Sequence, residues 1–258
     1  MSLFRTRPLP ATRPGLLLPA LLLAIAVPAH AVPQYVEAGT PLPRFHLLKE
    51  GSHRYLRYLR SGDGNTALDI WQRDIHFDGK QVQIRQRWDA AGRTPSVKRL
   101  ESTFEAGTMR PQTHVRITEK DGKKVVEGFV FADDRITGMA ALKDNTQKSL
   151  AVESKEPAFN FETDMELLQA LPLADGYEAQ MVLYHPGGPA APARYTFRVA
   201  GSEAIAGPAG PVDCWIVTTD YNAPGSVSKF WYAKGSQLMV KQESPLPDGR
   251  TLVKTLLD

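Results

Sequence analysis

The sequence predicts a mainly β protein, built as one large curved antiparallel sheet or half-barrel with one short helix packed on its concave side. Polar and apolar residues alternate over many segments, which is typical of antiparallel strands with one buried face. Asp-Gly pairs at 78–79, 121–122 and 248–249 fall between such segments, where tight hairpin turns favour glycine. One segment, 161–172, has helical spacing instead.

The alternation is clear near residue 85. Val82, Ile84 and Trp88 share one face of a predicted strand, while Arg85 and Arg87 share the other. The expected strands cover residues 54–60, 67–77, 81–88, 97–105, 112–119, 124–132, 148–153, 178–184, 194–199, 212–221, 226–233 and 237–243, with a last strand over 250–256.

The helical segment has its own start and stop signals. Thr163 and Glu166 have the spacing of a capping box. Apolar residues then recur at helical spacing before a proline ends the segment: Phe161, Met165, Leu168, Leu171 and Pro172. So short an apolar face is expected to pack on the sheet, with a mobile lid over a ligand cavity as the alternative. Acidic residues in the first turn are explained by the helix dipole: Glu162, Asp164 and Glu166.

Residues 1–31 have the pattern of an export signal. Arg5, Arg7 and Arg13 precede the uncharged apolar stretch 15–27, and Ala29-His30-Ala31 supplies the small residues that a signal peptidase needs. The apolar stretch is shorter than the roughly 20 residues of a membrane helix, and no cysteine for lipid attachment lies near the cleavage point. We therefore expect cleavage after Ala31 and a periplasmic protein without a transmembrane segment; the alternative is an uncleaved anchor.

Removal of the signal leaves 227 residues, enough for one large β domain or two small ones. The proline-rich stretch after the cleavage site lacks periodicity, which indicates an extended linker. Strands of the same character continue to the end of the chain, and no fixed-period repeat is present. We therefore divide the chain into a signal peptide (1–31), an extended linker (32–43) and a single antiparallel β domain (44–258).

The charge balance gives no support for nucleic-acid binding. The whole chain carries a net charge of +3, which the three arginines of the signal account for, so the mature chain is neutral. Residues 44–124 nevertheless contain 17 basic and 10 acidic residues. This surplus indicates either solvated faces that pair within the fold or a basic half that meets anionic lipid.

The residues that carry chemistry give no catalytic pattern, so we expect a protein that is not an enzyme and has no cofactor. No nucleophile elbow, phosphate-binding glycine loop or two-histidine zinc helix is present. Cys214 is the only cysteine and is expected to be a buried, inert thiol. An exported hydrolase is the minor alternative, and it would require two groups of one set to converge in a cleft: His76, His114, His185 and Asp74.

A metal site is the other chemistry to weigh. Asp74, His76 and Asp78 lie at alternate positions and share one strand face, where they could hold a divalent ion. Asp78 belongs to an Asp-Gly turn, however, and a solvated polar strand end accounts for all three. We predict no metal site.

The aromatic residues are the candidate ligand site. All four tryptophans fall within predicted strands, where aromatic side chains fill the core of a sheet or line a concave apolar pocket. The candidate lining residues are Trp71, Trp88, Phe197, Trp215, Trp231 and Met165.

From residue 161 onward, the helix FETDMELLQALPLADG precedes VAGSEAIAGPAGPVDCWIVTTDY, SKFWYAKGSQLMVKQES and GRTLVKTLL. This order of features resembles a bacterial exported family, the domain of unknown function 3108. The turn Gly207-Pro208-Ala209-Gly210 stands where the family has a Thr-Pro-Ala-Gly-like turn, with Gly207 in place of Thr, and Trp231-Tyr232 matches its Trp-Tyr motif. The resemblance mainly covers 161–257. It implies a curved sheet similar to the half-barrel carriers that hold acyl chains, but no catalytic residue.

Together these features predict a soluble periplasmic protein that binds an apolar ligand, a lipid or a lipidated partner such as a lipoprotein in the cell envelope. The alternative is an interaction module that docks on another envelope protein through its sheet edge or its basic half.

Overall fold

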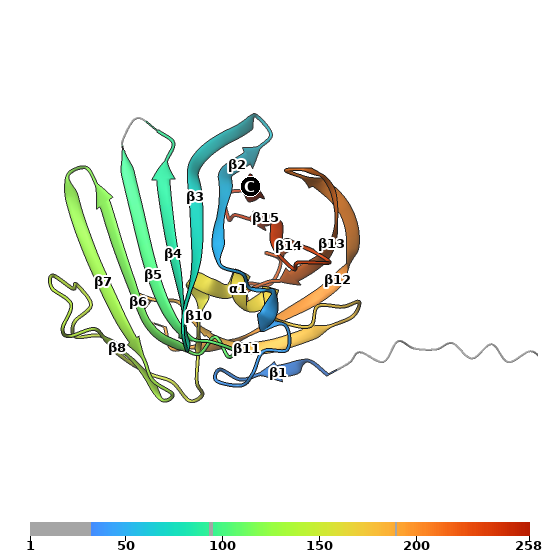
Figure 1. Ribbon diagram of the computed structural model, residues 1–258. Helices are drawn as coiled ribbons and strands as arrows, with labels where there is room; N and C mark the ends of the chain where they lie inside the picture. The colour runs from blue at the N-terminus through green and yellow to red at the C-terminus, as the bar shows by residue number, and fades with distance from the viewer. Residues whose placement is uncertain (1–31, 93–94, 189) are drawn as a thin grey trace, which may run out of the picture. The chain divides into compact units, whose positions relative to one another are not determined.

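Strands of the described chain form one mixed, sixteen-stranded sheet that curls around a short helix (Figure 1). The computed structural model describes residues 32–92, 95–188 and 190–258. The predicted signal peptide and its cleavage after Ala31 lie outside these residues. Within them, no helix is long and apolar enough to cross a membrane.

Most strands are longer than six residues, and the helical elements are short. The elements are β1 (Gln34–Val36), a 3-10 turn (Phe45–Leu47), β2 (Gly51–Ser61), β3 (Gly64–Asp78), β4 (Gln81–Ala90), β5 (Ser96–Glu105), β6 (Pro111–Lys120), β7 (Lys123–Phe131), β8 (Arg135–Gly138), β9 (Ala151–Glu153), β10 (Phe159–Asn160), a 3-10 turn (Phe161–Thr163), α1 (Asp164–Gln169), β11 (Glu178–Tyr184), β12 (Ala193–Gly207), β13 (Gly210–Thr219), β14 (Ser228–Ala233), β15 (Met239–Pro245) and β16 (Thr251–Leu256).

Two antiparallel meanders make up the sheet. One runs from β2 to β9 and the other from β11 to β16, and they join where β16 pairs antiparallel with β2. The sheet remains open, with β9 at one edge. The predicted fold class is confirmed: a large curved sheet, unclosed like a half-barrel, with a single short α-helix among the described residues.

The sheet is not purely antiparallel. The short strands β1 and β10 both pair parallel with β11, along the edge that the second meander leaves free. An open edge exposes unpaired backbone groups, so short covering strands stabilise it. The stretch 32–43, predicted as an extended linker, supplies β1 and buries Val36, Ala38 and Leu42 in the core. Period-two patterns miss strands this short: β1, β8 and β10 were not predicted.

All three Asp-Gly pairs lie at hairpin connections, of which two are tight: two residues join β3 to β4 and β6 to β7, whereas five residues join β15 to β16. In the β6–β7 hairpin, Asp121 and Gly122 both have positive φ, 52° and 69°, as a two-residue type I′ turn requires. The alternation of β4 is also confirmed, since Val82, Ile84 and Trp88 are buried while Arg85 and Arg87 are exposed.

Helix α1 lies inside the curve of the strands (Figure 1). All six of its residues are buried, and Met165, Leu167 and Leu168 belong to the same core as the aromatic side chains of β2–β4. The predicted capping box is wrong. The Thr163 hydroxyl donates to the Asn160 carbonyl, and Glu166 turns to a partner on the sheet.

Gly138 lets the 139–150 segment pack closely on β8. A Cβ built at this position would overlap the carbonyl oxygen of Gln147, which is backbone and cannot rotate away. We expect Gly138→Ala to lower the free energy of unfolding by about 1–3 kcal/mol, as overpacking does, measured by urea denaturation. Gly62→Ala is the control, because open space surrounds that position. Equal midpoints for both variants would contradict this packing.

Candidate functional site

A cavity of about 390 Å³ lies between the concave face of the sheet and the start of the helical segment. We call it the lumen cavity. Its walls come from both meanders, with Trp71 and Trp88 on one side and Ser228, Gln242 and Ser244 on another. Sites for small ligands usually measure about 300–1,000 Å³, so this cavity is large enough for one.

A stacked tryptophan pair forms one wall of the lumen cavity. Trp71 of β3 and Trp88 of β4 are directly opposite each other in the antiparallel register. Their rings are 5.4 Å apart between centroids and nearly parallel, at 6°. Both side chains are almost fully buried. The pair therefore gives the cavity a rigid aromatic wall.

Three cations of the cavity lining lie over this pair, and a fourth cation outside the lining, Arg73, lies 4.5 Å from the Trp71 ring centroid. The Lys254 ammonium is 4.6 Å from the Trp71 ring centroid, and the Lys98 ammonium is 4.7 Å from that of Trp88. The Arg57 guanidinium lies between them, 5.9 and 5.6 Å from the two rings. The register explains the row, because Lys254 pairs with Arg57 and Trp88 pairs with Lys98 across neighbouring strands.

The three cations differ in their partners. Arg57 donates two hydrogen bonds to Asp69, of 2.8 and 2.9 Å. Lys98 and Lys254, by contrast, form no ion pair with any residue that the structure describes, and their ammonium groups lie over aromatic rings. Burial lowers the pKa of Lys98, and it lowers the pKa of Lys254 to about 8 although Asp164 opposes the shift. The cavity wall therefore holds two ammonium groups without an ion-pair partner among the described residues, although the carboxylates of Glu162 and Asp164 lie in the same lining.

The carboxylates at the floor of the cavity do have partners. The Tyr221 hydroxyl donates to Asp164 at 2.7 Å, and Arg116 lies 3.3 Å from a Glu162 oxygen. Burial raises the pKa of Asp164. The floor is thus internally satisfied, unlike the lysines above it.

The wall from β14 and β15 is polar. The Ser228 hydroxyl and the Gln242 amide both donate to the Ser244 oxygen, at 2.8 and 2.9 Å. The Gln242 carbonyl oxygen and the Trp88 indole N–H are buried and have no partner among the described residues. Buried polar atoms in proteins are nearly always hydrogen-bonded, so two such atoms without a partner are unusual in the residues that line one cavity.

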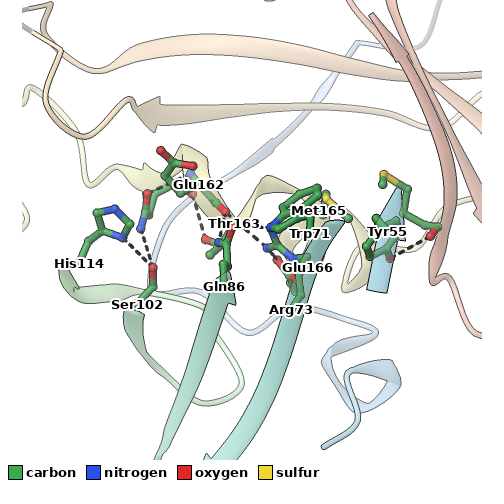
Figure 2. A network of polar contacts seen from close by, with 12 residues as sticks. Tyr55, Trp71, Arg73, Gln86, Ser102, His114, Glu162, Thr163, Met165 and Glu166 are labelled. Carbon is green, nitrogen blue, oxygen red and sulfur yellow. Dashed lines mark hydrogen bonds and ion pairs between the residues drawn. The ribbon is translucent and has the colours of Figure 1, made fainter. Parts of the chain in front are cut away.

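A buried polar network fixes the helix beneath the cavity (Figure 2). Arg73 of β3 forms a two-pronged ion pair with Glu166 of α1, with Nε 2.6 Å from one carboxylate oxygen. Gln86 accepts a hydrogen bond from the Trp71 indole at 3.3 Å and donates to the Glu162 carbonyl at 2.7 Å. The same contacts therefore orient the Trp71 wall and the helix floor together.

The predicted lining residues divide between the cavity and the core. Trp71 and Trp88 line the lumen cavity. Phe197 and Met165 are buried in the main core, and Trp215 packs at its margin. Trp231 faces the opposite side of the sheet, because it stands between two inward side chains of β14, and it packs there with Cys214.

Sequence reasoning missed the cationic row. A usable signal existed in β16, where Lys254 shares a strand face with Leu252 and Leu256 two residues away on either side. A lysine between two leucines on one face is out of place in a purely apolar core. The surplus of basic residues in 44–124 also includes Arg57 and Lys98, although the count alone does not mark them.

The residues considered for hydrolysis have separate partners. Nδ1 of His76 is 3.1 Å from Glu50, Nδ1 of His114 is 2.8 Å from the Ser102 hydroxyl, and Nε2 of His185 is 3.2 Å from the Tyr195 hydroxyl. Asp74 accepts from its neighbour on the strand, Gln72. Over the part of the chain that the structure describes, no group of three metal-ligating side chains comes together.

A second hollow of about 370 Å³ lies over β4–β6. It is lined by residues of β3 to β6, and charged groups there pair with each other, as Arg85 does with Glu101 at 3.1 Å. It therefore leaves less charge without a partner than the lumen cavity does.

Comparison with known proteins identifies the family of this chain and a solved structure with a similar fold. The family described as "Protein of unknown function (DUF3108)" matches residues 54–257. The chain belongs to this family. The match spans both meanders, so it extends the resemblance seen over 161–257 to the N-terminal half of the DUF3108 sheet.

A solved structure shares the fold of this DUF3108 protein. It is the crystal structure of a beta-barrel-like protein of domain of unknown function DUF1849 from Brucella abortus, at a TM-score of 0.51 and 15% identity. The alignment covers 81% of this chain and 97% of that one. No curated protein matches the chain. The likeness supports a barrel-like sheet and nothing about activity.

Proposed function

We propose that this protein is exported and binds a small amphiphilic ligand in the lumen cavity, without catalysing a reaction. One observation carries the proposal: a cavity of about 390 Å³ between the two meanders, with a stacked tryptophan pair as its wall. The export pattern of residues 1–31 supports a place in the periplasm.

The lining supports an amphiphile over a purely apolar ligand. Apolar surface is available from Trp71, Phe161 and Leu252, while serines, a glutamine and charged side chains line the rest. Concave sites in proteins combine apolar walls with a few placed polar groups that orient the ligand. A molecule with one polar end and one apolar end matches both parts of the cavity.

Native mass spectrometry tests the proposal. Protein purified from the periplasm is sprayed intact, and its organic extract is examined for lipids. The expected result is a stoichiometric small-molecule adduct that denaturation releases. Protein without an adduct, which also fails to bind a fluorescent fatty-acid probe, would contradict the proposal. A co-purifying protein partner without lipid would favour docking on another envelope protein instead.

Filling the cavity should abolish binding. Ser244 is half-buried in the lining, so Ser244→Phe places a ring in the lumen, and we expect affinity for the fatty-acid probe to fall at least about tenfold. Ser52→Phe is the matched control, since Ser52 is exposed on β2 and does not line the cavity. Circular dichroism verifies that both variants are folded. Unchanged probe affinity in folded Ser244→Phe would place the ligand elsewhere.

A further inference from the structure

We infer that the lumen cavity recognises an anionic head group, a carboxylate or a phosphate, through the ammonium groups of Lys98 and Lys254. The inference rests on the proposed function, because it names the chemical class of the ligand at the same site. The inference also goes beyond the proposed function, because a cavity of this size and lining would accept a neutral amphiphile as well.

Unbalanced charge is the first argument. Arg57, Glu162 and Asp164 each have a polar or charged partner within the described protein. Lys98 and Lys254 have no ion-pair partner among the described residues and lie over the faces of Trp88 and Trp71, with Glu162 and Asp164 attracting them only from beyond ion-pair distance. A buried charge is costly unless it is paired. A ligand that brings its own negative charge removes this cost, and the attraction is stronger there than in bulk water.

Donor and acceptor chemistry is the second argument. Ammonium groups donate hydrogen bonds and do not accept them, so their natural ligands are acceptors. The indole N–H of Trp88 is buried and has no partner among the described residues. An ionised carboxylate or phosphate group accepts hydrogen bonds and donates none. Hydrogen bonds to ionised groups are also stronger than those between neutral groups. The aromatic wall therefore presents donors where an anion would sit.

Proton uptake gives a signature of this contact. Lys254 faces Arg57 and Arg73 from the sheet and Asp164 and Glu162 from the helical segment, and its pKa lies near 8, with burial as the largest cause. An anion beside it would raise that pKa, so the lysine should take up a proton on binding at pH 8.5. Calorimetry in two buffers that differ in ionisation enthalpy measures this uptake.

Isothermal titration with three probes tests the inference: dodecyl phosphate, inorganic phosphate and 1-dodecanol. We expect the wild-type protein to bind dodecyl phosphate with proton uptake and to bind 1-dodecanol far more weakly. Lys98→Met and Lys254→Met should each weaken dodecyl phosphate about tenfold or more, because each removes a charged hydrogen-bond donor. Binding of inorganic phosphate as tightly as dodecyl phosphate would also support the inference, with a free anion as the ligand source.

The control and the contrary outcomes are distinct. Lys241→Met removes a lysine that lies 4.8 Å from the Trp231 ring on the opposite face of the sheet, so it should leave affinity unchanged. Equal affinity for 1-dodecanol and dodecyl phosphate, with no effect of the lysine variants, would overturn the inference but leave lumen binding intact. Absence of binding by every probe would overturn the proposed function as well. Lys254→Met should fold, because it removes an unpaired charge.

Discussion

Replacing Glu166 by glutamine should lower the free energy of unfolding by about 3–5 kcal/mol, the largest effect expected of any single change here. Arg73 and Glu166 are 2% and 4% exposed, and they pair across the interface between β3 and α1. Glutamine keeps the shape of the side chain but removes the charge. Arg73 is then left ionised in the core with neutral groups only: the amide oxygen of the new glutamine, the Glu162 carbonyl at 3.4 Å and the Trp71 ring.

Urea denaturation checks this expectation against two controls. Arg85→Ala breaks an exposed ion pair with Glu101, and it should cost less than about 1 kcal/mol. The double variant Arg73→Met/Glu166→Leu removes both charges and should recover most of the lost stability, since apolar replacements of buried pairs are often neutral. A Glu166→Gln midpoint equal to that of Arg85→Ala would show that the buried pair does not hold the helix.

The second large effect is a loss of stability in mild acid. His114 is fully buried between Ser102 and Phe129, and burial lowers its pKa to about 4. The unfolded chain has the ordinary histidine pKa of about 6.5. Between these values the unfolded state binds a proton that the folded state does not. Stability should therefore fall as pH drops from about 6.5 to about 4, by roughly 3 kcal/mol in total.

His114→Gln isolates this contribution from that of the carboxylates. Unfolding free energies are measured from pH 7 to pH 4 for the wild type and the variant, and the difference between the two curves reports His114. We expect the wild-type curve to be steeper over this window. His76→Gln is the control for removing a histidine from the surface. Parallel curves for wild type and His114→Gln would contradict a neutral, buried imidazole.

The sheet could be predicted from the sequence because each hairpin is a local signal. Alternation and Asp-Gly turns located thirteen strands, and the strands they missed are short: β1, β8 and β10. The pairing of β16 with β2 could not be predicted from a local sequence signal, because these strands lie at opposite ends of the domain in the sequence. Register across that junction is what places Lys254 beside Arg57.

The candidate site was harder to predict than the fold, for a physical reason. Glu166 matches a capping box within its own segment, yet its partner Arg73 lies 93 residues away in the sequence. A buried arginine without a carboxylate partner costs more free energy than an uncapped amide at the start of a helix, so Glu166 pairs with Arg73. Trp71 and Trp88 were identified from strand patterning alone, whereas the cations over them depend on neighbouring strands.

A crystal structure with 12-bromododecyl phosphate, read by the anomalous scattering of bromine, tests the central claim most directly. We predict phosphate density beside Lys98 and Lys254, with density for the alkyl chain beginning inside the lumen cavity that Trp71, Trp88 and Ser244 line. The same soak of Ser244→Phe crystals should show no ligand. Bromine and phosphate density found only on the outer face of the sheet, with an empty lumen in the wild type, would contradict the claim.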